Sequence, residues 1–106
     1  MTLQGERYRF SDDDIAHAPE RSGIYVLYNG PQIIFIGKAT GTSTIKSKLL
    51  SHKKGYEGPC TRHATHFIRE LSPSPANRER DLLQEYKNLY LRLPPCNAAL
   101  ANRYSF

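Results

Sequence analysis

The stretch SGIYVLYNGPQIIFIGKA, residues 22–39, decides the expected fold of this chain. It contains two apolar runs, GIYVLY at 23–28 and QIIFIG at 32–37, and the turn residues NGP lie between them. Two apolar runs joined by so short a turn are typical of a β-hairpin. The sequence therefore predicts two antiparallel strands at the centre of the fold.

The three-residue connection sets the expected register of this hairpin. It places Tyr28 opposite Gln32, and therefore Tyr25 opposite Phe35. Side chains alternate between the two faces of a strand. One face should hold Tyr25, Leu27, Ile33 and Phe35, with Gly37 at its end, and the other Ile24, Val26, Tyr28, Ile34 and Ile36. Because both faces are apolar, we expect both to be covered by helices.

Three segments outside the hairpin are predicted to be helical. SDDDIAHAP at 11–19 begins with a good N-cap residue, Ser11, and has acidic residues in its first turn. STIKSKLLSHKK at 43–54 can be capped by its first or second residue. ANRERDLLQEYKNLYLRL at 76–93 is the strongest helical pattern and is ended by two prolines.

One further strand completes the predicted architecture. ATHFIREL at 64–71 alternates like a half-buried strand, and residues 96–106 are expected to form a tail. The fold class is α/β, as an α+β sandwich: a small, mainly antiparallel central sheet of about three strands flanked by helices. The whole chain, residues 1–106, is expected to form a single domain.

Charge and composition narrow the classes of partner and location. Lysine and arginine number 15 against 10 acidic residues, a net charge of +5, and 39% of the residues are hydrophobic. This composition is that of a folded protein whose partner is anionic, nucleic acid first and an acidic membrane surface second. With a polar start and no long apolar run, we expect no membrane insertion and a cytoplasmic location, with free thiols at Cys60 and Cys96.

The predicted middle helix carries a basic face. Lys48 and His52 are four residues apart and share that face. The same third of the chain adds Lys46, Lys53, Lys54 and Arg62. A solvated helix face is one interpretation. The other is phosphate contact by an unneutralised basic stripe, because Glu20 is the only acidic residue between positions 14 and 57.

Glu85 interrupts the apolar face of the last predicted helix. That face is formed by Leu82, Leu83, Tyr86, Leu89 and Tyr90. The residue is either a rim glutamate that reaches solvent or a carboxylate aimed into a cleft. A partly buried carboxylate requires a cation, and Mg²⁺ often takes only one or two carboxylates.

A zinc site and a cysteine nucleophile are two alternative interpretations of the residues near Cys60. Cys60, His63 and His66 are spaced three apart, but that spacing fits no common zinc motif. Nothing in the pattern selects a cysteine–histidine nucleophile pair.

Several of these elements resemble the GIY-YIG nuclease superfamily. GIY at 23–25 and FIG at 35–37 resemble its two signature triplets, and KSKLLSH at 46–52 resembles its helix with a catalytic arginine. Glu85, followed twelve residues later by Asn97, resembles the metal-binding glutamate and the terminal asparagine. The likeness extends over roughly residues 18–97. The same residues also resemble the nuclease domain of the bacterial nucleotide-excision-repair incision enzyme.

The resemblance implies a metal-dependent endonuclease that hydrolyses DNA phosphodiester bonds in DNA repair or processing. It implies that Tyr25 positions or deprotonates the attacking water and that Glu85 holds Mg²⁺ or Mn²⁺. Asn97 would support the site and contact substrate, while Lys38 and His52 would line it. A nearby cation such as Lys38 is expected to lower the pKa of the phenol.

Two residues depart from the family pattern. Phe35 stands where the family has tyrosine, and Lys48 stands where it has arginine, so the bidentate hold on phosphate is lost. The alternatives are therefore a catalytically weakened nucleic-acid-binding module, or a nuclease subunit that a protein partner directs to DNA.

Overall fold

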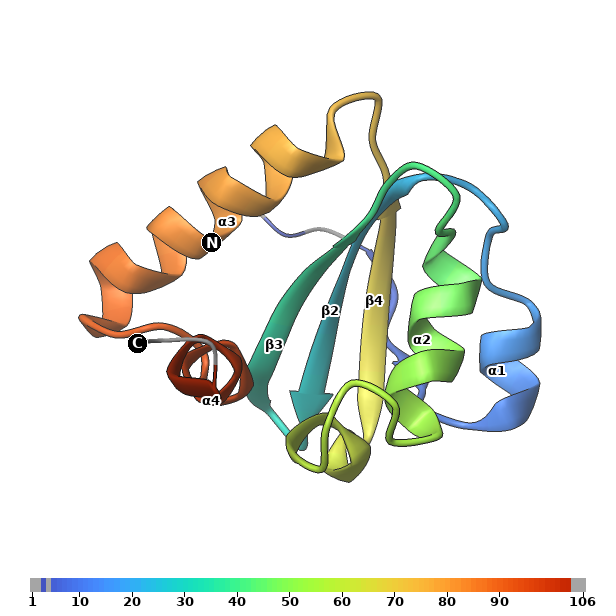
Figure 1. Cartoon of the computed structure of the whole chain (residues 1–106), viewed down its shortest axis with the longest axis horizontal. Coiled ribbons are helices and arrows are strands. Elements are labelled where there is room, and N and C mark those ends of the chain that lie inside the picture. Colours follow the sequence, from blue (N-terminus) through green and yellow to red (C-terminus); the bar gives the residue numbers. More distant parts are fainter. Residues whose placement is uncertain (1–2, 4, 104–106) are drawn as a thin grey trace.

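The computed structural model describes residues 3 and 5–103, with side chains as far as residue 100. It is an α+β domain with one antiparallel sheet, which confirms the predicted class (Figure 1). The strands are β1 (Tyr8–Arg9), β2 (Gly23–Asn29), β3 (Gln32–Ala39) and β4 (His66–Leu71), in the spatial order β1-β4-β2-β3. The sheet has four strands rather than three, because the two residues of β1 pair with β4.

Helices lie on both sides of this sheet (Figure 1). They are α1 (Asp12–Ala16), α2 (Ile45–Lys53), α3 (Pro75–Tyr90) and α4 (Pro95–Arg103), with the short 3₁₀ helix η1 (Cys60–His63) between α2 and β4. One apolar layer joins the sheet to α1 and α2 and includes Tyr25, Leu27 and Phe35. The other joins it to α3 and includes Ile24, Val26 and Ile36. Coverage of both sheet faces by helices is thus confirmed.

The hairpin register differs from the prediction. Tyr25 lies opposite Gly37, and Leu27 lies opposite Phe35. The turn has two residues instead of three, and a β-bulge follows in which Ile34 has no partner of its own. A bulge adds one residue to one strand and locally breaks the alternation. As a result, the predicted faces of Ile33 and Ile34 are reversed. Ile34 packs in the layer of Tyr25, and Ile33 packs against the opposite layer.

The ends of the helices follow from local sequence, with two errors. Ser11 accepts a hydrogen bond from the Asp14 N–H, and Thr44 forms a capping box with Ser47, so both predicted N-caps are confirmed. The predicted tail is wrong, since most of it forms α4. α3 itself ends at Tyr90, three residues before the predicted end at 93, because Leu91 adopts a left-handed backbone. Pro95 instead begins α4, because proline fits the first turn of a helix, where its missing N–H is not needed.

Among the described residues, no helix combines the length and apolar character needed to cross a membrane.

Candidate active site

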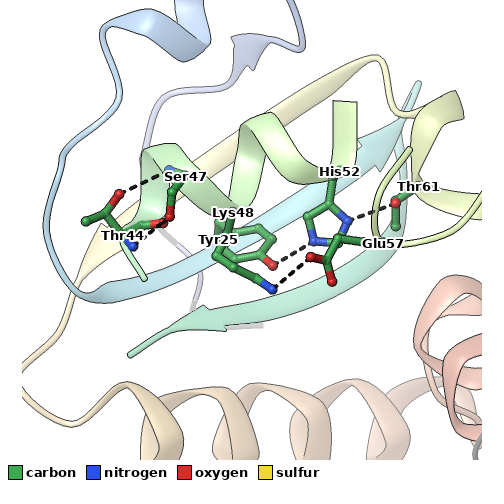
Figure 2. A network of polar contacts seen from close by, with 7 residues as sticks. All are labelled: Tyr25, Thr44, Ser47, Lys48, His52, Glu57 and Thr61. Carbon is green, nitrogen blue, oxygen red and sulfur yellow. Dashed lines mark hydrogen bonds and ion pairs between the residues drawn. The ribbon is translucent and has the colours of Figure 1, made fainter. Parts of the chain in front are cut away.

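A buried chain of hydrogen bonds joins three elements on the α2 side of the sheet (Figure 2). The hydroxyl of Tyr25, on β2, lies 2.7 Å from Nε2 of His52, on α2. Nδ1 of His52 lies 2.8 Å from Oγ1 of Thr61, on η1. Tyr25 is 1% exposed, His52 2% and Thr61 3%. The imidazole is therefore held at both nitrogens, and its orientation is fixed.

His52 is neutral at physiological pH. Burial lowers its pKa from 6.5 to about 4, and the charge of Glu57 offsets part of that effect. A neutral imidazole donates at one nitrogen and accepts at the other, and the two hydroxyls can supply either partner. The expectation that His52 belongs to the solvated basic face is wrong, because α2 turns this residue toward the sheet.

Gly37 makes room for the phenol. A Cβ atom at this position would lie 2.5 Å from both Cζ and Oη of Tyr25 and 2.7 Å from the Phe35 ring. The Phe35 ring centroid is 4.9 Å from that of His52. Residues 35–37, FIG, thus contribute the space beneath the Tyr25 hydroxyl and an apolar wall beside the imidazole.

An ion pair lies next to this chain. Nζ of Lys48 is 3.2 Å from Oε2 of Glu57, and both side chains are about one quarter to one third exposed. Burial raises the pKa of Glu57, but its bonds to Lys48 outweigh that effect, so the pKa is lowered overall. Sequence reasoning missed Glu57, which lies in a loop with no periodic pattern. Figure 2 shows the ammonium of Lys48 and the hydroxyl of Tyr25 pointing to the same side of α2.

A second carboxylate comes from α3, and it is Glu79. Its Oε1 lies 3.6 Å from Nζ of Lys38, on β3, and its side chain is 22% exposed. Burial raises the pKa of Glu79, and the charge of Lys38 opposes this rise. A carboxylate whose charged form is destabilised by burial is stabilised when a cation binds.

The phenol of Tyr25 is protonated. Its pKa is raised well above 10 by burial, followed by the negative charges of Glu57 and Glu79. The expected lowering of this pKa by Lys38 is therefore wrong. The physical reason is that burial disfavours the charged phenolate, and the two carboxylates Glu57 and Glu79 add to this effect.

The charge of Glu85 acts elsewhere on α3. It raises the pKa of Arg78, whose strongest partner is Glu70 of β4, at 2.6 Å. Glu79 lies three residues before the buried Leu82, and Glu85 lies three residues after it. Helical spacing alone therefore could not decide which of the two glutamates faces Tyr25. The metal-binding role of Glu85 stays a prediction, and Glu79 is the residue of α3 whose charge reaches Tyr25.

Two lysines of the basic face of α2 have carboxylate partners. Besides the pairing of Lys48, Nζ of Lys46 lies 3.5 Å from Glu20, and the Lys53 ammonium lies over the Phe10 ring at 5.4 Å. Lys54 and Arg62 are exposed. The expectation of an unneutralised stripe is therefore wrong at Lys46 and Lys48, because the fold brings Glu20 and Glu57, distant in sequence, next to this helix. At Lys53, Lys54 and Arg62, contact with phosphate stays a prediction.

Asn97 connects α4 to β3. Its Oδ1 accepts from the Ile36 N–H at 2.9 Å, and its Nδ2 donates to the Ile36 carbonyl at 3.0 Å. These bonds hold the strand next to Gly37. They fit the expected supporting role, while substrate contact by Asn97 stays a prediction.

Cys60 and Cys96 form a disulfide, 36 residues apart in sequence. The expectation of free thiols is therefore wrong. The two cysteines no longer support the prediction of a reducing compartment, because that prediction rested on free thiols. The bond ties η1, which carries Thr61, to α4, which carries Asn97.

Within the described part of the chain, no group of three or more histidine, cysteine or acidic side chains could hold a metal ion. A Mg²⁺ ion held by one carboxylate, water and phosphate oxygens remains compatible with Glu79.

Comparison with models of protein families, with curated proteins and with solved structures gave no match for this chain.

Proposed function

We propose that this chain is a metal-dependent endonuclease that hydrolyses DNA phosphodiester bonds. One observation carries the proposal: the phenol of Tyr25, which lies over Gly37, is within electrostatic reach of two carboxylates. One is Glu57, which is paired with the Lys48 ammonium of α2, and the other is Glu79 of α3, which is paired with Lys38. The carboxylate in this proposal is Glu79. The likeness to the GIY-YIG signature supplies the reaction class.

The side chains have distinct roles in this proposal. Glu79 would hold Mg²⁺ or Mn²⁺, and such an ion polarises the phosphate and stabilises the leaving oxygen. Lys48 stabilises the added negative charge of the transition state, with Glu57 holding its ammonium in place. In the tautomer that this role requires, the Tyr25 hydroxyl donates a hydrogen bond to Nε2 of His52, so that the phenol oxygen would accept a hydrogen bond from the attacking water. The phenol therefore orients water while it stays protonated.

The test is cleavage of branched, single-stranded-tailed and plain duplex DNA with Mg²⁺ or Mn²⁺. Glu79→Gln should lower the rate at least about 100-fold, since it removes the proposed metal ligand. Glu85→Gln is the matched control, with the same change six residues further along α3, and should keep most of the activity. Equal rates for the wild type and Glu79→Gln contradict the proposal. A loss confined to Glu85→Gln assigns the metal to Glu85.

The second candidate is a DNA-binding module without turnover. The specific observation that favours it is the apolar Phe35 ring against His52, where a tyrosine would add a hydroxyl. It predicts salt-sensitive DNA binding with no cleavage. The double variant Phe35→Tyr/Lys48→Arg should then gain cleavage, and a double variant that only binds DNA argues against these two residues as the cause.

A further inference from the structure

A pocket lies at the turn of the hairpin, beside Gly30 and at the end of β3 that is far from Gly37. Its volume is about 410 Å³, within the usual range for small-ligand sites. We call it the tyrosine–arginine pocket, after Arg7, Tyr28, Tyr86, Tyr90 and Arg92. None of the described residues that line it is acidic. Gln32, which lines the pocket, is five positions before Gly37 on β3, which is roughly 17 Å along a strand.

Aromatic rings form one wall of this pocket. Tyr86 and Tyr90 are one turn apart on α3, with ring centroids 4.6 Å apart. Tyr86 is buried and fixes the pair, while Tyr90 is 54% exposed. A tyrosine ring that is supported from behind and open in front offers a flat surface for stacking.

Two guanidinium groups supply the charge. The Arg7 guanidinium lies 4.0 Å from the Tyr28 ring centroid, and Nη1 is 3.4 Å from the Gly30 carbonyl. This placement leaves further N–H groups of Arg7 available, because a guanidinium has five. Arg92 reaches the pocket because Leu91 adopts a left-handed backbone with φ of 59°, which turns the chain at the end of α3.

We propose that the tyrosine–arginine pocket binds one nucleotide of a single-stranded nucleic acid. The base stacks on Tyr90, and the adjoining phosphate lies between Arg7 and Arg92. Stacking tolerates any base, and arginine suits phosphate. An acidic peptide would use the arginines but has no planar group for the exposed Tyr90 ring.

This inference rests on the proposed function for its choice of substrate strand, and it narrows that substrate. A site one hairpin length from Gly37 fits DNA in which a duplex or branch point adjoins a single-stranded tail. The tail would pass along α3 to its C-terminal end.

The experiment is fluorescence anisotropy of labelled dT8 without divalent metal, so that binding is measured apart from cleavage. A blunt duplex and an octaglutamate peptide are the comparison probes. Tyr90→Ala should weaken dT8 binding about tenfold, and Tyr90→Phe should retain it. Arg92→Ala should weaken binding and reduce the salt slope by about 0.7. Arg21→Ala, an exposed arginine beyond the other end of β2, is the charge-matched control.

The outcomes separate the two proposals. Loss of dT8 binding in Tyr90→Ala but not in Arg21→Ala supports the pocket, even if no DNA is cleaved and the proposed function fails. Equal affinity of Tyr90→Ala and wild type for dT8 overturns the pocket assignment, whether or not cleavage occurs. Binding of octaglutamate as tightly as dT8 also overturns it and indicates an acidic protein partner.

Discussion

The hydroxyl of Tyr25 lies 2.7 Å from Nε2 of His52, and both side chains are almost fully buried. Burial raises the pKa of the phenol and lowers that of the imidazole, so both groups are uncharged near neutral pH. The pair therefore acts as a fixed, neutral hydrogen-bonded unit beneath the site.

Tyr25→Phe should lower the free energy of unfolding by about 1–3 kcal/mol, because it leaves a buried nitrogen of His52 without its partner. The measurement is urea denaturation at pH 7. Tyr56→Phe is the control, since Tyr56 is 76% exposed and should change stability little. Equal stability of Tyr25→Phe and wild type would falsify the buried hydrogen bond.

Stability should fall as the pH drops from about 6.5 to about 4. His52 is neutral in the folded state down to about pH 4, whereas the unfolded chain takes up a proton near 6.5. The unfolded state binds more protons in this window, which costs stability on the order of 3 kcal/mol at its lower end. His52→Gln should flatten the profile, and the exposed His63→Gln should leave it as in wild type. A flat wild-type profile between these pH values contradicts a buried, neutral His52.

Removal of the disulfide should destabilise the protein by about 3–4 kcal/mol, as expected for a loop closed over 36 residues. Thermal unfolding with and without dithiothreitol measures this. The double variant Cys60→Ser/Cys96→Ser should unfold at a lower temperature and should no longer respond to the reductant. Two reactive thiols in the unreduced native protein would show that the bond is not formed.

Gly37→Ala should lower the free energy of unfolding by about 2 kcal/mol or more. The added methyl group would lie 2.5 Å from the Tyr25 phenol, so the ring or the strand must move. In a Tyr25→Ala background the same change should cost much less, and the double-mutant cycle gives the coupling. Additive effects would mean that the ring does not lie over Gly37.

Leu91→Gly should stabilise the protein by about 1 kcal/mol. Leu91 has a left-handed backbone that glycine adopts without penalty, and its side chain is 87% exposed. Leu89→Gly is the matched control, because it places glycine inside α3 and should destabilise by about 1 kcal/mol. Destabilisation by both variants would argue against a left-handed turn at Leu91.

Much of the fold could be predicted from local sequence. The hairpin strands, the N-caps at Ser11 and Thr44 and the strand near Phe67 all follow from alternation, capping chemistry and helical periodicity. These signals depend only on residues that are close together in the sequence, so they can be recognised without the tertiary structure. The bulge at Ile34 and the helix that begins at Pro95 were missed. The residues NGP are compatible with a two-residue or a three-residue connection, and a proline can either follow a helix or begin one.

The candidate site could be predicted only in part. The sequence by itself placed Tyr25 on a core strand and Lys48 and His52 on one helix, because strand and helix periods fix such positions. Only the tertiary structure paired Glu57 with Lys48, brought Glu79 rather than Glu85 into the electrostatic field of Tyr25, and joined Cys60 to Cys96. The physical reason is that electrostatic and covalent partners are chosen by distance in space, and residues far apart in the chain become neighbours only when the sheet and its helices pack.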